Sequence, residues 1–321
     1  MNILVSGGHG YVGSALVPQL LQDGHWVKVV DVGWFGKNIK DHEHLEDIDG
    51  DVREPEKEWF QDIDVVIHLA GVSNDPTAEL SPLANYEINT VGTALMAEMA
   101  KKCGVKKFIF ASTCSVYGFV AGKEISKEND KTTPKYPYGI SKVMAEAALL
   151  ALNESDFATI ILRKGTIGGY APRMRYDLVV NTMTKGGIQS GKIFVKHASQ
   201  WRPVVDIRDV VRAYTVALQK PIWGIFNVSQ GNYTIRQLGK MVAGVLSSNG
   251  YKVDVDIDEV CDLRNYKASN EKAQEDLEFS AEKSVSDTVT SILQEDSLKD
   301  FSNDKYYNIR IFEKLMQQER L

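Results

Sequence analysis

Short apolar segments alternate with longer segments of helical periodicity through the first half of the chain. The apolar segments predict strands at residues 2–6, 26–31, 64–70, 106–112 and 159–163. Apolar residues at helical spacing predict helices at residues 11–22, 85–102 and 138–151. Strands that alternate with helices of this length are typical of βαβ units, so we expect an α/β fold with a parallel sheet.

The pattern is weaker after residue 163. Residues 165–175 are rich in Gly, Pro and Arg, which predicts a loop. Further strand and helix signals lie in residues 204–219, 224–228, 234–246 and 280–293. Residues from 294 onward are mostly charged and polar, and we interpret them as a surface tail or a contact between subunits.

A glycine-rich turn joins the first predicted strand to the first predicted helix. Gly7, Gly10 and Gly13 have the spacing G-x-x-G-x-x-G. Glycines let the backbone approach a pyrophosphate closely, and the helix N-terminus adds N–H groups and a positive dipole end. Asp31 ends the second predicted strand, where a carboxylate accepts hydrogen bonds from an adenosine ribose and repels a 2′-phosphate. We therefore predict a dinucleotide site that favours NAD over NADP.

A tyrosine and a lysine lie four residues apart in the predicted helix at 138–151. This spacing places Tyr138 and Lys142 on one face of the helix. A neighbouring ammonium favours the phenolate, so we expect the pKa of Tyr138 to fall toward neutrality. Such a tyrosine can act as general acid or base on a hydroxyl. Thr113 follows a buried strand and should face the same crevice at the carboxyl ends of the strands.

Composition and charge exclude several classes of protein. The 321 residues include 37 Lys+Arg and 43 Asp+Glu, a net charge of −6, with no basic stripe. This excludes a disordered chain and disfavours nucleic acid as a partner. Three cysteines are too few for a disulfide framework or a zinc site. Apolar runs are too short for a membrane span, and the first strand leaves no room for a signal peptide, so we expect a soluble, cytoplasmic protein without a metal.

Taken together, the motifs resemble the extended short-chain dehydrogenase/reductases of the NAD-dependent nucleotide-sugar epimerase/dehydratase family, similar to UDP-glucose 4-epimerases. The matching residues are 7–13, Asp31, 50–53, 68–71, Asn89, 92–93, 112–118, 138–142, 162–163, 202–206 and Asp209. They cover about the first two-thirds of the chain in family order. The last third resembles the family weakly, around residues 262–273.

The resemblance implies a Rossmann-type doubly wound parallel sheet with a smaller C-terminal substrate-binding domain. Residues 1–165 and 204–228 would form the NAD-binding domain, and residues 166–203 and 229–321 the nucleotide-sugar domain. The residues implied to bind NAD are Gly7, Gly10, Tyr11, Val12, Gly13, Asp31, Asp51, Val52, Leu69, Ala70, Gly71, Asn89, Ser112, Tyr138 and Lys142.

The resemblance also implies a catalytic set and a substrate site. Thr113, Tyr138 and Lys142 would be catalytic, and Lys142 would also contact the nicotinamide ribose. The candidate substrate contacts are Ser73, Asn74, Thr113, Thr166, Arg173, Arg175, Asn181, Arg202 and Arg264. Among these, Thr166 stands where the family usually has Asn. Arg173 and Arg175 could bind an acidic sugar or a phosphate, or lie in a solvated loop. A homodimer formed through the helices at 85–102 and 138–151 is expected from the family.

The two residues that follow Thr113 distinguish the reactions within this family. The 4,6-dehydratases carry Asp-Glu there and the decarboxylases a Glu at the second position, whereas this chain has Cys114 and Ser115. The resemblance therefore implies a 4-epimerase that works through a transient 4-keto sugar. The alternatives are a 4-ketoreductase, a 3,5-epimerase/4-reductase that pairs Cys114 with a histidine such as His197, and a non-catalytic NAD(P)-binding scaffold.

Overall fold

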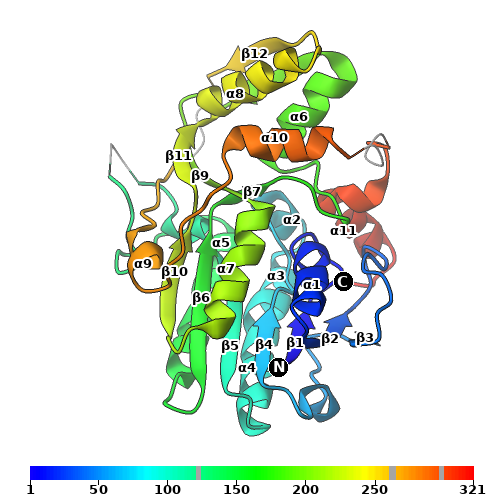
Figure 1. The fold of residues 1–321 in the computed structure, drawn as a ribbon, viewed down its shortest axis with the longest axis vertical. Coiled ribbons are helices and arrows are strands. Elements are labelled where there is room, and N and C mark those ends of the chain that lie inside the picture. Colours follow the sequence, from blue (N-terminus) through cyan, green and yellow to red (C-terminus); the bar gives the residue numbers. More distant parts are fainter. Residues whose placement is uncertain (121–123, 260–264, 296–299) are drawn as a thin grey trace.

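The computed structural model describes residues 1–120, 124–259, 265–295 and 300–321. Its main sheet has seven strands in the order β10-β6-β5-β4-β1-β2-β3 (Figure 1). Every pairing in this sheet is parallel. The strands are β1 Asn2–Ser6, β2 Trp26–Asp31, β3 Leu45–Asp49, β4 Val65–His68, β5 Lys107–Thr113, β6 Ala158–Lys164 and β10 Gly224–Val228.

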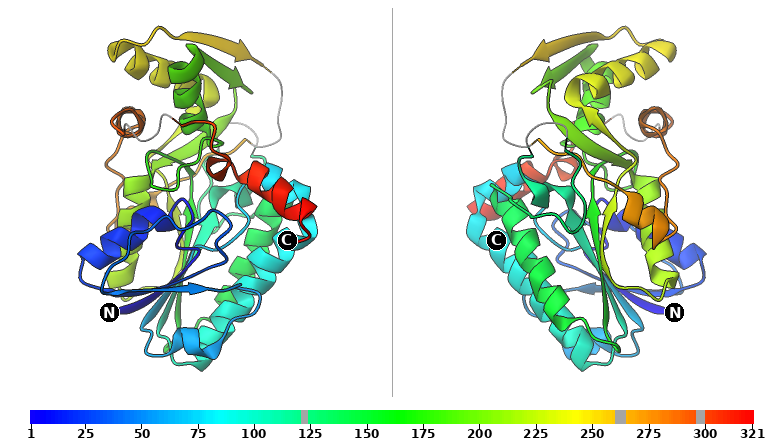
Figure 2. Two further views of the ribbon diagram at one scale, coloured as in Figure 1. Left: turned by 90° about the vertical axis from the view of Figure 1, so that its right-hand side faces the viewer. Right: turned by 90° about the vertical axis from the view of Figure 1, so that its left-hand side faces the viewer.

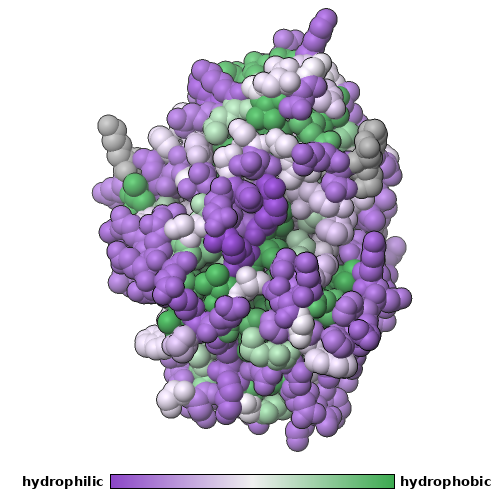
Figure 3. Space-filling view, viewed as in Figure 1, coloured by the Kyte–Doolittle hydropathy of each residue, from purple (hydrophilic) through white to green (hydrophobic). Residues whose placement is uncertain are grey.

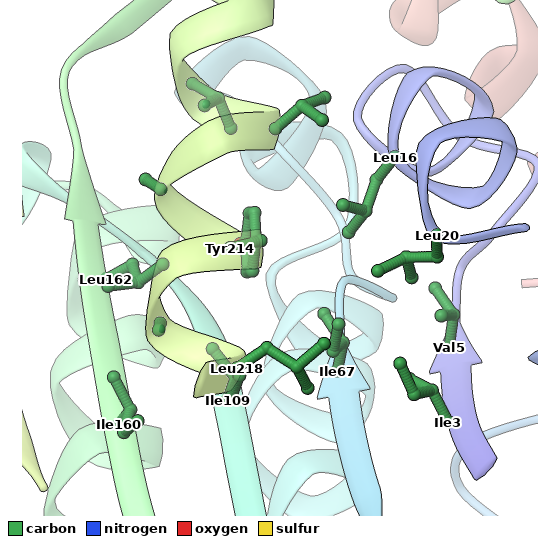
Figure 4. Close-up of a cluster of buried hydrophobic side chains, with 14 of the residues drawn as sticks. Ile3, Val5, Leu16, Leu20, Ile67, Ile109, Ile160, Leu162, Tyr214 and Leu218 are labelled. Carbon is green, nitrogen blue, oxygen red and sulfur yellow. The ribbon is translucent and has the colours of Figure 1, made fainter. Parts of the chain in front are cut away.

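Helices cover both faces of this sheet (Figure 2). One face packs against α1 (Gly13–Gln22) and α7 (Ile207–Gln219). In that layer the strand residues Ile3, Ile67, Ile109 and Ile160 meet Leu16, Leu20, Tyr214 and Leu218 of the two helices (Figure 4). The other face packs against α4 (Thr93–Lys102) and α5 (Pro137–Leu152). The predicted doubly wound α/β fold is confirmed.

A second group of elements lies beyond the carboxyl ends of the main sheet, at the top of Figure 1. It contains a three-stranded sheet of β11 (Gly231–Thr234), β9 (Trp201–Asp206) and β7 (Thr166–Gly168). A two-stranded sheet pairs β8 (Lys192–Lys196) with β12 (Asp254–Asp258). The helices of this region are α6 Val179–Ser190, α8 Ile235–Ser248 and α10 Val285–Leu293. The predicted domain boundary at residue 204 falls inside β9.

The helix predicted at 85–102 is interrupted. After α2 (Asp75–Leu80), helix α3 (Pro82–Tyr86) runs into a π-helical segment, η2 (Glu87–Gly92), before α4 begins. Within this segment, Asn89 donates hydrogen bonds to the Val72 carbonyl and the Ser141 hydroxyl. A π-helical turn is wider than an α-helical turn, and here the wider turn contains Asn89 with its tertiary contacts. Helical periodicity in the sequence does not predict such a turn.

Three other predictions need correction. The predicted loop at 165–175 contains the short strand β7, and the edge strand β3 was missed. The interpretation of the residues after 294 as a surface tail is wrong for residues 300–321. There α11 (Asn308–Gln317) buries Phe312 and Leu315, and Tyr307 beside it is also buried. Remaining short elements are η1 Lys57–Phe60, η3 Cys114–Tyr117, α9 Glu271–Glu275 and η5 Asp304–Tyr306.

The surface shown in Figure 3 is mostly hydrophilic, with hydrophobic residues in scattered patches. In the described part of the chain, no helix combines the length and the apolar character needed to cross a bilayer.

His68 at the end of β4 is a buried polar group in this core. Its Nδ1 lies 2.6 Å from Ser6 Oγ and its Nε2 lies 3.0 Å from Thr93 Oγ1. Burial, followed by the nearby charge of Lys142, lowers the pKa of His68 to about 3. The imidazole is therefore neutral in the folded protein.

We expect His68 to make the protein less stable in acid. Because its pKa is near 6.5 when unfolded and about 3 when folded, the unfolded chain binds one more proton between these values. Neutral His68 makes its full contribution to the free energy of unfolding above pH 6.5. Below that value the free energy of unfolding falls by about 1.4 kcal/mol per pH unit. In urea unfolding between pH 4 and 7, His68→Gln should flatten this slope. The exposed His42→Gln is the control, and an equal slope in both variants would refute this prediction.

Candidate functional site

A cavity of about 640 Å³ lies between the carboxyl ends of the main sheet and the second group of elements. Most of the predicted site residues line it. These are Gly7, Gly10, Tyr11, Val12, Gly13, Leu69, Gly71, Ser73, Asn74, Ser112, Thr113, Tyr138, Lys142, Thr166, Arg173, Arg175 and Arg202. Residues predicted for the cofactor, the catalysis and the substrate therefore share one cavity.

The glycine loop packs too closely against neighbouring backbone to hold side chains at Gly7 and Gly13. Gly7 has a φ of +75°, and a Cβ there would come within 2.6 Å of the Ala70 nitrogen. A Cβ on Gly13 would lie 2.3 Å from the Gly8 carbonyl oxygen. Helix α1 starts at Gly13 and directs its N-terminus to this loop. Such a cradle without side chains fits the pyrophosphate of NAD.

Asp31 lies at the end of β2, beside the glycine loop and outside the cavity lining. Its Oδ2 accepts a hydrogen bond from the His9 backbone N–H and its Oδ1 one from the Gly33 N–H, both at 2.9 Å. Burial raises the pKa of Asp31, and the two backbone hydrogen bonds oppose that rise. Each carboxylate oxygen keeps a further lone pair with which it could accept a ribose hydroxyl.

Several predicted contacts lie away from the cavity. Asp51 forms an ion pair with Arg53, with 2.7 Å between Oδ2 and Nη2. Val52 and Asn89 are buried, and Ala70 is half-buried. Ser112, by contrast, lines the cavity, but its hydroxyl donates to the buried Glu146. Arg264 lies outside the described residues.

Asn181 is fully buried in α6 and supports the site from behind. Its Nδ2 donates to the Tyr11 hydroxyl at 3.2 Å, and its Oδ1 accepts from the Gly169 N–H at 2.9 Å. Tyr11 in turn donates to the Gly169 carbonyl. The structure therefore gives Asn181 a role in orienting Tyr11, which does line the cavity.

The three predicted catalytic side chains come from β5 and α5. Lys142 is 3 % exposed, and its Nζ lies 4.7 Å from the centre of the Phe110 ring. Burial lowers the pKa of Lys142 to about 8. The expected fall in the pKa of Tyr138 is not found. Burial raises this pKa, because a phenolate is poorly solvated there, and a hydrogen bond with Thr113 opposes the rise only in part.

Cys114 is separated from the cavity. It is 1 % exposed, and its Sγ donates to the Arg163 carbonyl at 3.1 Å. Burial raises the pKa of the Cys114 thiol, which opposes thiolate formation. His197 does line the cavity, but Cys114 does not. The geometry therefore does not pair Cys114 with His197.

Ser115 is the neighbour that faces the cavity. Its Oγ lies 3.0 Å from the hydroxyl of Tyr266. Asp75 and Asp177 are the acidic side chains that line the cavity within the described residues. Asp177 is already paired with Arg175, with 2.7 Å between Oδ2 and Nη2.

Sequence reasoning missed several residues that line the cavity. Lys164 is buried and donates to the Tyr214 hydroxyl at 2.9 Å, and burial holds the pKa of Lys164 well below its ordinary value. Its position directly after Leu162 and Arg163, which match the family, could have drawn attention to it. Gln200 has a buried Nε2 without a hydrogen-bond partner among the described residues. Neither Gln200 nor Asn308 carries a motif that would identify it.

Similar proteins point to one family. Residues 3–229 match the model of the NAD dependent epimerase/dehydratase family. A putative UDP-glucose 4-epimerase of Methanocaldococcus jannaschii is 30% identical over 241 residues, which cover 72% of this chain and 78% of that protein. UDP-glucuronic acid decarboxylase 1 of Xenopus tropicalis is 27% identical over 77% of this chain, which spans 61% of that relative.

The structure has close neighbours as well. UDP-glucose 4-epimerase of Thermotoga maritima, solved with UDP-glucose, superposes with a TM-score of 0.79 at 26% identity. The match covers 91% of this chain and 97% of that one. Among the described residues, no group of His, Cys, Asp and Glu side chains is arranged to hold a metal ion.

Proposed function

Because the chain belongs to the NAD dependent epimerase/dehydratase family, an enzyme family whose cofactor is NAD, we propose that it is a nucleotide-diphosphate-sugar 4-epimerase. The observation that carries this proposal is the shared cavity of the glycine loop with Thr113, Tyr138 and Lys142. The cavity has no Asp or Glu at positions 114 and 115, the pair that would serve water elimination. Because 4-epimerases and a decarboxylase are both similar to this chain, similarity alone does not distinguish the two reactions. The lack of a carboxylate at positions 114 and 115 favours epimerisation.

In the proposed reaction, Tyr138 removes the proton from the sugar C4 hydroxyl as a phenolate, so the charge of Lys142 must offset the burial that raises the pKa of Tyr138. NAD held at the loop of Gly7, Gly10 and Gly13 would supply reversible hydride chemistry at C4 with no net change in redox state. Thr113 hydrogen-bonds the same hydroxyl. Lys142 stabilises the phenolate of Tyr138 electrostatically, which requires the protonated amine. Because burial lowers the pKa of Lys142 to about 8, its charge is sensitive to pH just above neutrality.

The substrate diphosphate would bind on the side of the second group of elements. Arg202 is 8 % exposed, lines the cavity and donates from Nη2 to Gln200 Oε1 at 3.0 Å. The Nε2 of Gln200 has no hydrogen-bond partner among the described residues. A guanidinium fork beside a free amide N–H suits phosphate oxygens.

The proposed reaction can be tested with UDP-glucose and UDP-glucuronic acid as probes. Proton NMR of the purified protein should show inversion at C4 without accumulation of NADH. Consumption of NAD(P)H in proportion to a reduced 4-keto sugar would reject the epimerase and identify a 4-ketoreductase. Retention of NAD with neither reaction on any nucleotide sugar would favour a binding scaffold.

We also propose that two copies pair through α4 and α5. Apolar side chains are exposed along these helices and the segment before α4, namely Leu83, Val91, Leu95, Met144 and Leu150. Burial of this surface against its own copy would remove it from water. Light scattering after size exclusion should give twice the chain mass, and the double variant Leu95→Asp, Met144→Asp should give the monomer mass. A monomeric parent protein would contradict the proposal.

A further inference from the structure

Arg173 is a buried cation inside the cavity, on the segment between β7 and α6. It is 1 % exposed, and its guanidinium carbon lies 3.8 Å from the centre of the Phe35 ring. Its Nη2 donates to Asn308 Oδ1 of α11 at 2.6 Å. The backbone N–H of Arg173 donates to Ser14 Oγ in the first turn of α1. Three elements that are distant in sequence therefore hold this side chain in place.

The charge of Arg173 is not neutralised within the protein. Across residues 1–120, 124–259, 265–295 and 300–321, no carboxylate forms an ion pair with it, and its buried Nε has no hydrogen-bond partner. Arg175, two residues along, differs because Asp177 and Ser73 engage its guanidinium. A buried, unpaired guanidinium with a free N–H is unfavourable unless an anion joins it. Burial accordingly lowers the pKa of Arg173 to about 9.

The surroundings of Arg173 belong to the cofactor half of the cavity. Ser14 lies next to the last glycine of the loop, and Phe35 follows the strand that ends at Asp31. The loop offers backbone N–H groups and a helix end, but no formal positive charge. Its histidine, His9, is engaged with Asp47 at 3.1 Å. A pyrophosphate in this loop would therefore lack a cationic partner from the loop itself.

We propose that Arg173 is a ligand of the NAD pyrophosphate, and that Phe35 and Asn308 position it for that role. This assigns to the cofactor a residue that the sequence suggested for the substrate. An arginine fork can bind two phosphate oxygens at once, and the aromatic face and the amide fix its plane. The proposal rests on the family's cofactor and not on the epimerase reaction, so the two can fail separately.

The test measures how firmly the purified protein keeps NAD. Arg173→Met retains the apolar stem over Phe35 but loses the fork, so we expect the rate of NAD loss after gel filtration to rise at least tenfold. Arg173→Lys should lie between Met and the parent, because it keeps the charge without the fork. Arg310→Met, an exposed arginine on α11, is the matched control and should lose NAD at the parent rate.

Retention of NAD at the parent rate would overturn the proposal, whatever the effect on UDP binding. NAD retention at the parent rate in Arg173→Met, with UDP binding to the same protein weakened tenfold or more, would overturn the proposal and assign Arg173 to the substrate diphosphate. Parent-like NAD retention with parent-like UDP binding would overturn it too. If circular dichroism shows that Arg173→Met does not fold, Arg173→Lys and Asn308→Ala decide instead, and parent-like NAD retention in both would reject it.

Discussion

Tyr138→Phe should lower turnover by about a hundredfold to ten-thousandfold while the purified protein still carries NAD. General acid–base catalysis contributes about 10²–10⁴-fold, and the phenol oxygen is the atom that carries the proton in the proposed reaction. The substitution removes one oxygen from a buried ring and leaves the glycine loop unchanged. NMR of C4 inversion measures the loss, and the NAD content of the denatured protein measures retention.

A neighbouring tyrosine makes this experiment specific. Tyr136 lies two residues earlier, just before α5, and is not among the residues that line the cavity. Tyr136→Phe should keep turnover near that of the parent. Full activity in Tyr138→Phe would refute the proposed mechanism, whereas loss of both activity and NAD would indicate a structural role for the hydroxyl.

Arg163→Met should destabilise the protein by about 3–5 kcal/mol, because it leaves Glu146 buried without its partner. Both side chains are 4 % exposed, and Arg163 Nη2 lies 2.7 Å from Glu146 Oε2. Arg163 also donates to the Tyr117 hydroxyl at 3.1 Å. The pair joins β6 to α5 directly behind the catalytic residues. Urea unfolding of the NAD-loaded protein measures the loss.

A second substitution separates charge from packing in this pair. Adding Glu146→Gln to Arg163→Met removes the unpaired carboxylate, so part of the lost stability should return. The control is Lys102→Met, whose partner Glu98 forms an exposed pair on α4. It should change stability by less than about 1 kcal/mol. An equally small loss in Arg163→Met would show that the buried pair does not stabilise the fold.

The parts of the fold that the sequence predicted are those that bury apolar residues on both faces. Strands such as β1 and β5 are almost wholly buried, so their apolar runs identify them. β3 was missed because it is an edge strand whose residues are half-buried or exposed. The glycine loop was predictable because its spacing follows directly from the backbone geometry it must adopt.

The site was predictable only where local spacing specifies chemistry. Tyr138 and Lys142 share a helix, so their spacing brings them together. The pKa of Tyr138 depends on burial by elements far along the chain, and sequence spacing does not record that burial. Asn308 illustrates the same limit, because it contacts Ser73 from 235 positions away. Such contacts exist only after the two groups of elements have packed together.

The contact between α11 and the cofactor half has a consequence for synthesis. Ribosomes make the glycine loop, Phe35 and Ser73 first, and Arg173 near the middle of the chain. The brace from Asn308 is added almost three hundred residues after the loop itself. A nascent chain can therefore form the dinucleotide cradle early but completes the Arg173 pocket only after residue 308 has left the ribosome. On the proposed role of Arg173, firm retention of NAD requires that synthesis has passed residue 308.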